Sequence, residues 1–195
     1  MKLRAIRDDR DRGSDMTSTA RSISEEEGRA VVPMSSEAYR DAMSRIAGAV
    51  HVIASDGPAG AGGATMTAVT SVTDSPPTVL ICLNRSTRFN AILRANGVFS
   101  VNTLVEGDET LAGVFAGIGR IDHPDRFEPG RWLRGATGAP LLTSARATLD
   151  CRISDSIEVG SHTVFFGRVE AVGLGAARPA LLYVDRAYRT VGSAS

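Results

Sequence analysis

Short strand patterns separated by strong turn and helix signals fill residues 63–104, and they constrain the fold more than any other stretch. The first run is rich in Thr and Val, which suit a pleated, half-buried surface. Two consecutive prolines then break the run and start a turn, and an Asn-Gly pair ends the helical pattern that follows. The predicted elements are a strand over 63–72, a turn at Pro76-Pro77, a strand over 78–83, a helix presenting Phe89, Ile92 and Leu93 and ending at Asn96-Gly97, and a strand over 98–101.

The flanking sequence adds mostly strands. Six or more short strands with only three helices favour an antiparallel barrel over a doubly wound sheet. A first helix is predicted after a cap at Ser35 or Ser36, with Tyr39, Ala42, Met43 and Ile46 on one face and Gly48 at its end, and another helix over 108–116. Strands are predicted over 49–54, 147–153, 162–172 and 180–188. The predicted connections are a glycine-rich bend over 60–63, a long segment over 117–140 and a turn over 158–161. In the strand over 147–153, Ala147, Leu149, Cys151 and Ile153 are expected to face inward, and Thr148, Asp150 and Arg152 outward.

Composition limits the class of protein. The chain has 195 residues, enough for one domain with a substantial core, and its 22 basic and 22 acidic residues cancel. A neutral chain without a basic stripe argues against nucleic acid as a partner. The sequence contains neither an apolar run long enough to span a bilayer nor a secretory signal. We therefore predict a cytoplasmic protein with no membrane contact, in which Cys82 and Cys151 stay reduced.

Residues 1–33 differ in character from the rest. They carry seven basic and seven acidic side chains among Ser, Thr and Gly, with little periodic apolar content. This composition is typical of a flexible tail. The predicted organisation is therefore a charged N-terminal tail over 1–33 and one folded domain over 34–192.

Two features of the central stretch suggest a ligand. The first strand carries small hydroxyl residues at Thr65, Thr67, Thr70 and Ser71, which would let a flat ligand approach the backbone. The helix start over 84–87 offers backbone N–H groups, hydroxyls and an arginine, a suitable place for a phosphate. The same residues also suit a Thr-rich edge strand and an ordinary N-cap, so the residues alone leave both interpretations open.

The same stretch resembles the short-chain flavin reductase family, the reductase components of two-component flavin monooxygenases. The resemblance rests on the ordered motifs Gly63-Ala-Thr-Met-Thr-Ala68, Ser71-Val72, Pro76-Pro77, Cys82-Leu-Asn84 and Val101-Asn-Thr-Leu104, and it extends over about residues 38–190. Met66 departs from the family, which usually has Ala there. The most similar members are the NADH:FMN reductase of pyrimidine ring cleavage and the reductases of 4-hydroxyphenylacetate and chlorophenol hydroxylation.

The resemblance implies a fold, an activity and partners. The fold would be mainly β: an antiparallel Greek-key split β-barrel of six or more strands with a few short flanking helices. The protein would be an NAD(P)H:flavin oxidoreductase that reduces FMN or FAD with NADH or NADPH and supplies a separate monooxygenase. It would work as a homodimer with the flavin near the interface.

The resemblance also implies site residues. His162, in a Gly-x-His pattern after a turn, would contact the nicotinamide as the catalytic residue. His51 and His123 are expected to be structural or solvated, and three scattered histidines predict no metal site. The predicted flavin-binding residues are Thr65, Met66, Thr67, Ala68 and Val69 along the ring edge, Ser71, Asn84, Arg85, Ser86, Thr87 and Asn90 around the ribityl chain and phosphate, and Phe115, Phe127 and Tyr188 around the stacking space.

Two other functions fit the same pattern. A flavin-binding or redox-sensing split-barrel protein without turnover would hold one flavin and consume negligible NADH. An enzyme similar to pyridoxamine-phosphate oxidases would consume oxygen and need no NADH. The absence of an acid–base pair fits all three, because the cofactor carries the redox chemistry.

Overall fold

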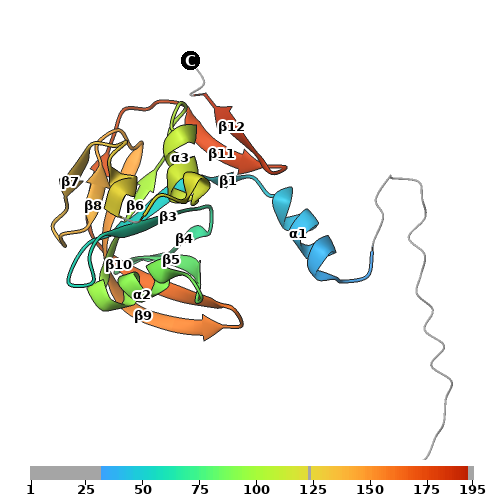
Figure 1. Ribbon diagram of the computed structural model, residues 1–195, viewed down its shortest axis with the longest axis horizontal. Coiled ribbons are helices and arrows are strands. Elements are labelled where there is room, and N and C mark those ends of the chain that lie inside the picture. The colour runs from blue at the N-terminus through green and yellow to red at the C-terminus, as the bar shows by residue number, and fades with distance from the viewer. Residues whose placement is uncertain (1–31, 123, 193–195) are drawn as a thin grey trace, which may run out of the picture.

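The structure is a computed structural model that describes residues 32–122 and 124–192. His123 therefore lies outside the described residues, and so does the predicted tail over 1–33, except for Val32 and Pro33. The described chain is mainly antiparallel β structure with three α-helices, as predicted, and Figure 1 shows the sheets gathered into one body with α1 standing outside it. The helices are α1 (Ser36–Ser44), α2 (Arg88–Asn96) and α3 (Glu109–Phe115), with 3-10 turns η2 (Ile118–Arg120) and η3 (Pro124–Phe127).

The strands form one large sheet and two small ones. The large sheet has the order β3-β2-β6-β9-β10-β5-β4, and the small sheets have the orders β1-β11-β12 and β7-β8. The strands are β1 (Gly48–Ala49), β2 (His51–Ser55), β3 (Gly62–Met66), β4 (Val69–Asp74), β5 (Pro77–Asn84), β6 (Val98–Thr103), β7 (Trp132–Arg134), β8 (Pro140–Leu142), β9 (Ala147–Val159), β10 (His162–Leu174), β11 (Ala180–Val184) and β12 (Ala187–Val191).

The large sheet curls because its two edge strands are consecutive in the chain. β3 and β4 lie at opposite ends of the strand order, yet only Thr67 and Ala68 connect them. Two linking residues span at most about 11 Å between the strand ends. The seven strands must therefore wrap around until their edges nearly meet at this link, which explains the barrel-like form of the body (Figure 1).

The inside of the curl is filled by one apolar cluster. Phe89, Phe99 and Phe165 are its largest fully buried members. α2 covers this cluster with Phe89, Ile92 and Leu93. Thr87 caps its N-terminus, and Gly97 ends it with a left-handed φ of 69°, as the Asn-Gly pair predicted.

A second apolar cluster lies on the other face of β2. It includes Val50, Val52 and Leu104, and α3 and β11 close it with Leu111 and Leu181. Alternate residues of β2 therefore serve two cores, because side chains alternate between the faces of a strand.

The structure corrects four details of the predicted elements. The single strand predicted over 63–72 is broken at Thr67-Ala68, because its two halves pair with different strands. The strand predicted over 180–188 is a hairpin whose turn residues, Asp185 and Arg186, have φ values of 50° and 57°. β9 continues to Val159, so the turn predicted over 158–161 is shorter. The bend predicted over 60–63 already contains the start of β3.

Two further corrections concern burial. Thr148 and Asp150 were predicted to face solvent, but they are buried: the Asp150 carboxylate accepts hydrogen bonds from the Thr137 backbone N–H, at 2.9 Å, and from its hydroxyl. Helix α1 begins at its predicted cap, Ser35, yet none of its residues is buried. Its predicted apolar face stays open, with Tyr39 60% exposed.

We predict that Gly167→Ala destabilises the protein by overfilling the barrel. A Cβ at Gly167 would lie 2.3 Å from the Phe99 ring and 3.1 Å from Cys151 Cβ. Overpacking of this kind costs about 1–3 kcal/mol of unfolding free energy, which denaturant titration measures. Phe99→Leu should cost less in the Gly167→Ala background than in the wild type. Equal costs in the two backgrounds would contradict this packing.

Candidate functional site

A pocket of about 430 Å³ opens beside the link between the two edge strands. Of the predicted flavin-binding residues, Thr65, Met66, Thr67 and Tyr188 line it. The Thr65 hydroxyl donates a 2.7 Å hydrogen bond to the Ala112 carbonyl of α3, so it also fixes the helix against the wall. The other lining residues are Val50, Ala116, Ile118, Tyr183, Arg186 and Ala187.

The link itself has a fixed shape. The Val69 N–H donates to the Thr67 carbonyl at 2.8 Å, and the Cys82 N–H donates to the Ala68 carbonyl at 3.2 Å. Thr67 and Ala68 are both exposed. The link is therefore a rigid, small-residue surface, which is what close approach of a flat ligand to the backbone requires.

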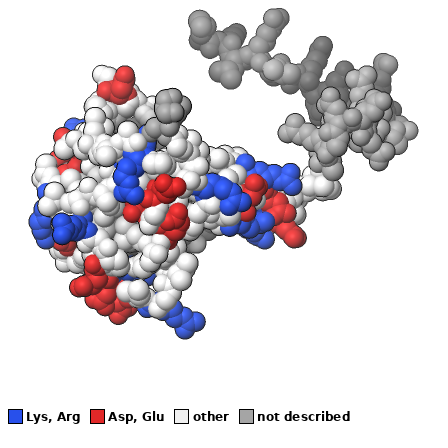
Figure 2. All heavy atoms as spheres, turned by 90° about the horizontal axis from the view of Figure 1, so that it is seen from above, with Lys and Arg blue, Asp and Glu red and all other residues white. Residues whose placement is uncertain are grey.

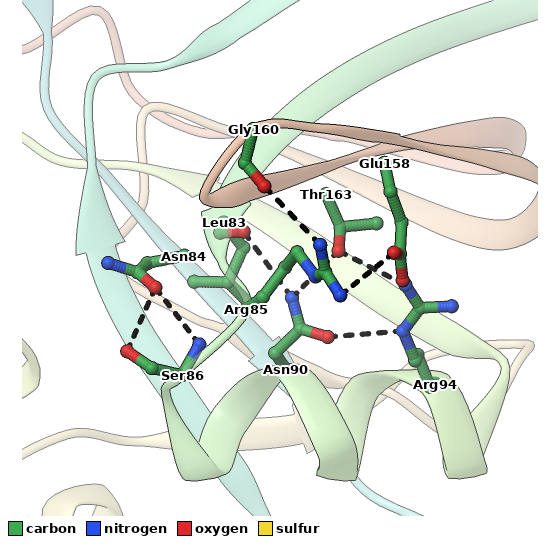
Figure 3. Close-up of polar contacts among 9 residues, drawn as sticks. All are labelled: Leu83, Asn84, Arg85, Ser86, Asn90, Arg94, Glu158, Gly160 and Thr163. Carbon is green, nitrogen blue, oxygen red and sulfur yellow. Dashed lines mark hydrogen bonds and ion pairs between the residues drawn. The ribbon is translucent and has the colours of Figure 1, made fainter.

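The turn from Asn84 to Thr87 is held by its own hydrogen bonds. The Asn84 side-chain oxygen accepts from the Ser86 N–H and hydroxyl, both at 2.9 Å (Figure 3). The Thr87 hydroxyl donates to the Asn84 carbonyl at 2.8 Å. Thr87 also caps α2 by accepting from the Asn90 N–H. The turn thus sets exposed hydroxyls at the positive end of the α2 dipole, where an anion is stabilised.

His162 lies directly beside this turn. It opens β10 and pairs with Asn84 of β5 in the antiparallel ladder. Its ring is exposed, and its Nδ1 lies 2.9 Å from the Ser161 hydroxyl. The predicted nicotinamide contact and the predicted phosphate turn are therefore cross-strand neighbours, although 78 residues separate them in sequence.

The link and the turn lie on the same side of the sheet. Ala68 is bonded to Cys82, and Asn84 follows Cys82 by two residues, or about 7 Å along the strand. Ile81 and Leu83 point into the barrel, so Cys82 and Asn84 point outward. Pocket, link, turn and His162 therefore follow one another along the outer face of the barrel.

Five predicted residues form no part of the surface made by the pocket, the link and the turn. Phe115 is 1% exposed and packs in the second core, where its ring lies 5.2 Å from Phe127 and 5.6 Å from Trp132. Val69 packs against the barrel core, Ser71 is exposed on edge strand β4, and Asn90 is buried under the turn. The two phenylalanines therefore have the core-packing role that any buried aromatic fills.

Asn90 holds the turn from below. Its amide nitrogen donates to the Leu83 carbonyl at 3.3 Å and to the Thr163 hydroxyl at 3.2 Å, and its oxygen accepts from Arg94 at 3.2 Å (Figure 3). Arg85, whose role as a phosphate ligand stays a prediction, forms an ion pair with Glu158 at 3.0 Å.

On the C-terminal side of the pocket, sequence reasoning predicted only Tyr188 and missed Tyr183 and Arg186. Tyr183 and Tyr188 are cross-strand partners whose rings meet edge to face at 5.5 Å. Arg186, in the turn between them, forms an ion pair with Asp41 of α1. The motif around Tyr188 could have suggested Arg186, but only the hairpin register shows that Tyr183 lies on the same wall.

Burial shifts the pKa of three groups around the site. Desolvation lowers the pKa of His51, which pairs with Met66 of β3, to about 4. Desolvation also raises the pKa of Tyr188, with the neighbouring Tyr183 adding to the shift, and raises that of the Cys82 thiol. All three groups are therefore neutral at pH 7.

Neither the charges on the face shown in Figure 2 nor the metal-ligating side chains of the described residues indicate a second site. On the face shown in Figure 2, acidic and basic side chains intermingle and form no basic stripe. Within residues 32–122 and 124–192, no cluster of three His, Cys, Asp or Glu could hold a metal ion. No helix in the described part of the chain is both long and apolar enough to cross a membrane.

Comparison with known proteins identifies the family. Residues 43–192 match the family described as flavin reductase like domain. The chain belongs to this family. The membership confirms the resemblance found in the motifs, and with it the predicted class of enzyme, an oxidoreductase that acts on flavin.

Individual relatives of this flavin reductase cover most of its length. "FMN reductase (NADH) RutF" of Methylorubrum extorquens strain DM4 is 50% identical over 162 residues, 83% of this chain and 78% of that protein. The structure of BorF, the flavin reductase component of a bacterial two-component tryptophan halogenase, superposes with a TM-score of 0.76 at 30% identity, covering 82% of this chain and all of BorF. The NADH:FAD oxidoreductase SgcE6 of Streptomyces globisporus C-1027 gives 0.77 at 31% identity, covering 86% and 99%.

We predict that His51 makes the flavin reductase less stable in mild acid. Its pKa is 6.5 when exposed and about 4 when folded, so between these values the unfolded chain binds the extra proton. Stability is therefore lost as pH falls from 6.5 towards 4, by about 2 kcal/mol at pH 5. Denaturant titrations at pH 7.5 and 5 should show a smaller loss for His51→Gln; an identical loss would contradict this assignment.

Proposed function

We propose that this flavin reductase is an NADH-dependent FMN reductase that supplies reduced FMN to a separate monooxygenase. The observation that carries the proposal is the continuous outer surface formed by the pocket, the Thr67-Ala68 link, the Asn84 turn and His162. The name of the relative at 50% identity supports FMN and NADH. The relative named for FAD is less similar, at 31% identity, so FMN is the better choice of flavin.

The residues along this surface fit a phosphorylated flat ligand. Small side chains at Thr67 and Ala68 leave the link accessible to a ring. The outer side of β5 and β10 next to it is apolar and only partly covered, at Leu80, Cys82 and Val164. The Asn84 turn, at the N-terminus of α2, is the place for the phosphate.

Bound flavin would supply the chemistry, by accepting a hydride from the nicotinamide. The protein orients the reactants. Thr65, Met66 and Thr67 bound one side of the pocket and Tyr188 the other, while His162 contacts the nicotinamide from the barrel rim. Positioning of this kind lowers the barrier because the reacting groups must come within about 3.5 Å. Phe115 and Phe127 have no part in this proposal, because both pack in the core.

We propose, further, that the protein is a homodimer. α1 has no buried residue. Tyr39 and Met43 of α1, with Ile46 just beyond its end, form an apolar row that the described chain leaves 60%, 45% and 61% exposed. A second copy would bury it.

The proposed location is the cytoplasm, and the monooxygenase partner is supported by the description of BorF as the flavin reductase component of a two-component halogenase.

Dimerisation through α1 predicts a change in mass. Met43→Glu places a charge within the apolar face, and Arg40→Glu changes a charge on the same helix outside the Tyr39–Met43–Ile46 row. Sedimentation should give a dimer for the wild type and Arg40→Glu and a monomer for Met43→Glu, because burying an unpaired charge is costly. A wild-type monomer, or an unchanged dimer for Met43→Glu, would remove α1 from the interface.

Steady-state oxidation of NADH with added FMN tests the proposed activity. The wild type should consume NADH only when flavin is present. His162→Ala should raise the KM for NADH about 3- to 10-fold, the effect of losing one hydrogen bond, while flavin affinity stays normal. Absence of oxidation with FMN and FAD would refute the activity. A KM unchanged in His162→Ala would refute only the role of that side chain.

A further inference from the structure

The tip of the β9–β10 hairpin is tied to the Asn84 turn by one acidic residue. Glu158 Oε2 lies 3.0 Å from Arg85 of the turn, and its Oε1 lies 2.8 Å from Arg94 of α2. Figure 3 shows the carboxylate between the two guanidinium groups. Glu158 is therefore shared by the two elements that bear the proposed phosphate site.

One of the two arginines is a firm anchor. Arg94 also donates to Asn90 Oδ1 at 3.2 Å and to the Thr163 hydroxyl at 3.1 Å, and its guanidinium lies 5.5 Å from the Phe165 ring centroid. Arg85 is bound to the hairpin as well: its backbone N–H donates to Ser161 and its guanidinium to Gly160. Through Glu158, the anchored Arg94 holds both Arg85 and the hairpin tip.

His162 depends on this arrangement because it stands at the end of its ladder. It pairs with Asn84 on one side and Val159 on the other, and the hairpin turn, residues 160–161, immediately precedes it in the chain. Ends of ladders open most easily. Glu158 lies opposite Thr163, one residue from His162, so it restrains the last ladder pair at its weakest point.

We infer that Glu158 is a positioning residue that holds His162 in place for the nicotinamide; this rests on the proposed function. Isolated exposed ion pairs contribute little, but a network of several charges is the recognised exception. The network also compensates the charge of Arg85. Loss of Glu158 should therefore weaken the nicotinamide contact without weakening the phosphate site, because the turn becomes more positive.

The test compares Glu158→Gln with Glu170→Gln. Glu170 forms a single ion pair with Arg152, at 2.8 Å, across the same hairpin but away from its tip. Glu158→Gln should raise the KM for NADH about 3- to 5-fold, with kcat within about twofold and no increase in the KM for FMN. Glu170→Gln should leave all three unchanged. A general loosening of the fold would move both variants alike.

A double-mutant cycle with His162→Ala shows whether Glu158 acts through the histidine. In the His162→Ala background, Glu158→Gln should change the KM for NADH by less than about twofold. If the two substitutions raise the KM for NADH by independent factors that multiply in the double mutant, the inference is overturned. Equal changes in this KM for Glu158→Gln and Glu170→Gln also overturn it. A wild type that oxidises NADH normally separates this failure from failure of the proposed function, in which no variant would have activity to lose.

Discussion

The two-residue link between β3 and β4 is the constraint on which the rest of the structure depends. Because Thr67 and Ala68 join the two edges of a seven-stranded sheet, the sheet has to curl, and its interior has to be filled by the Phe89, Phe99 and Phe165 cluster. The same link leaves a gap in hydrogen bonding between the edges. The exposed wall of the pocket begins at that gap, so the fold and the proposed binding surface have one origin.

The outer surface combines elements that are distant in sequence. The β5–β10 register brings His162 to Asn84, and the C-terminal hairpin brings Tyr183 and Tyr188 to the wall of β3. Two of these elements are separately anchored: Thr65 ties β3 to α3, and Asn90 holds the Asn84 turn from beneath. A surface supported in this way can hold a ligand in a fixed orientation without a lid.

The sequence predicted those helix ends, helix faces and turns whose conformation depends on residues only a few positions apart. The caps Ser35 and Gly97, the buried face of α2 and the turn at Pro76 follow from side-chain and backbone preferences within a few residues. The cap of α2 is Thr87, where a serine was expected. The break at Thr67-Ala68 could not be predicted, because strand propensity continues through it and only pairing with different partners interrupts it. Burial of Asp150 and Phe115 depends on Thr137 and Trp132, which come from a segment without a clear pattern.

The site residues divide in the same way. Thr65, Thr67, Asn84 and His162 were selected from contiguous motifs that resemble a known family, and the structure places them along one outer surface. Their roles toward a ligand stay predictions. Glu158 carries no local signal, since a charged residue in a hairpin is ordinary until its partner is known. Predicting Arg85 as a phosphate ligand omitted the carboxylate that neutralises it, and that carboxylate is visible only across the hairpin.

A crystal structure with FMN bound tests the central claim most directly. The account predicts the ring against Thr67 and Ala68 on the outer face of the barrel, the phosphate at the turn from Asn84 to Thr87, and the His162 side chain on the open side of the ring. Flavin bound on any other face, or a phosphate away from that turn, would contradict it.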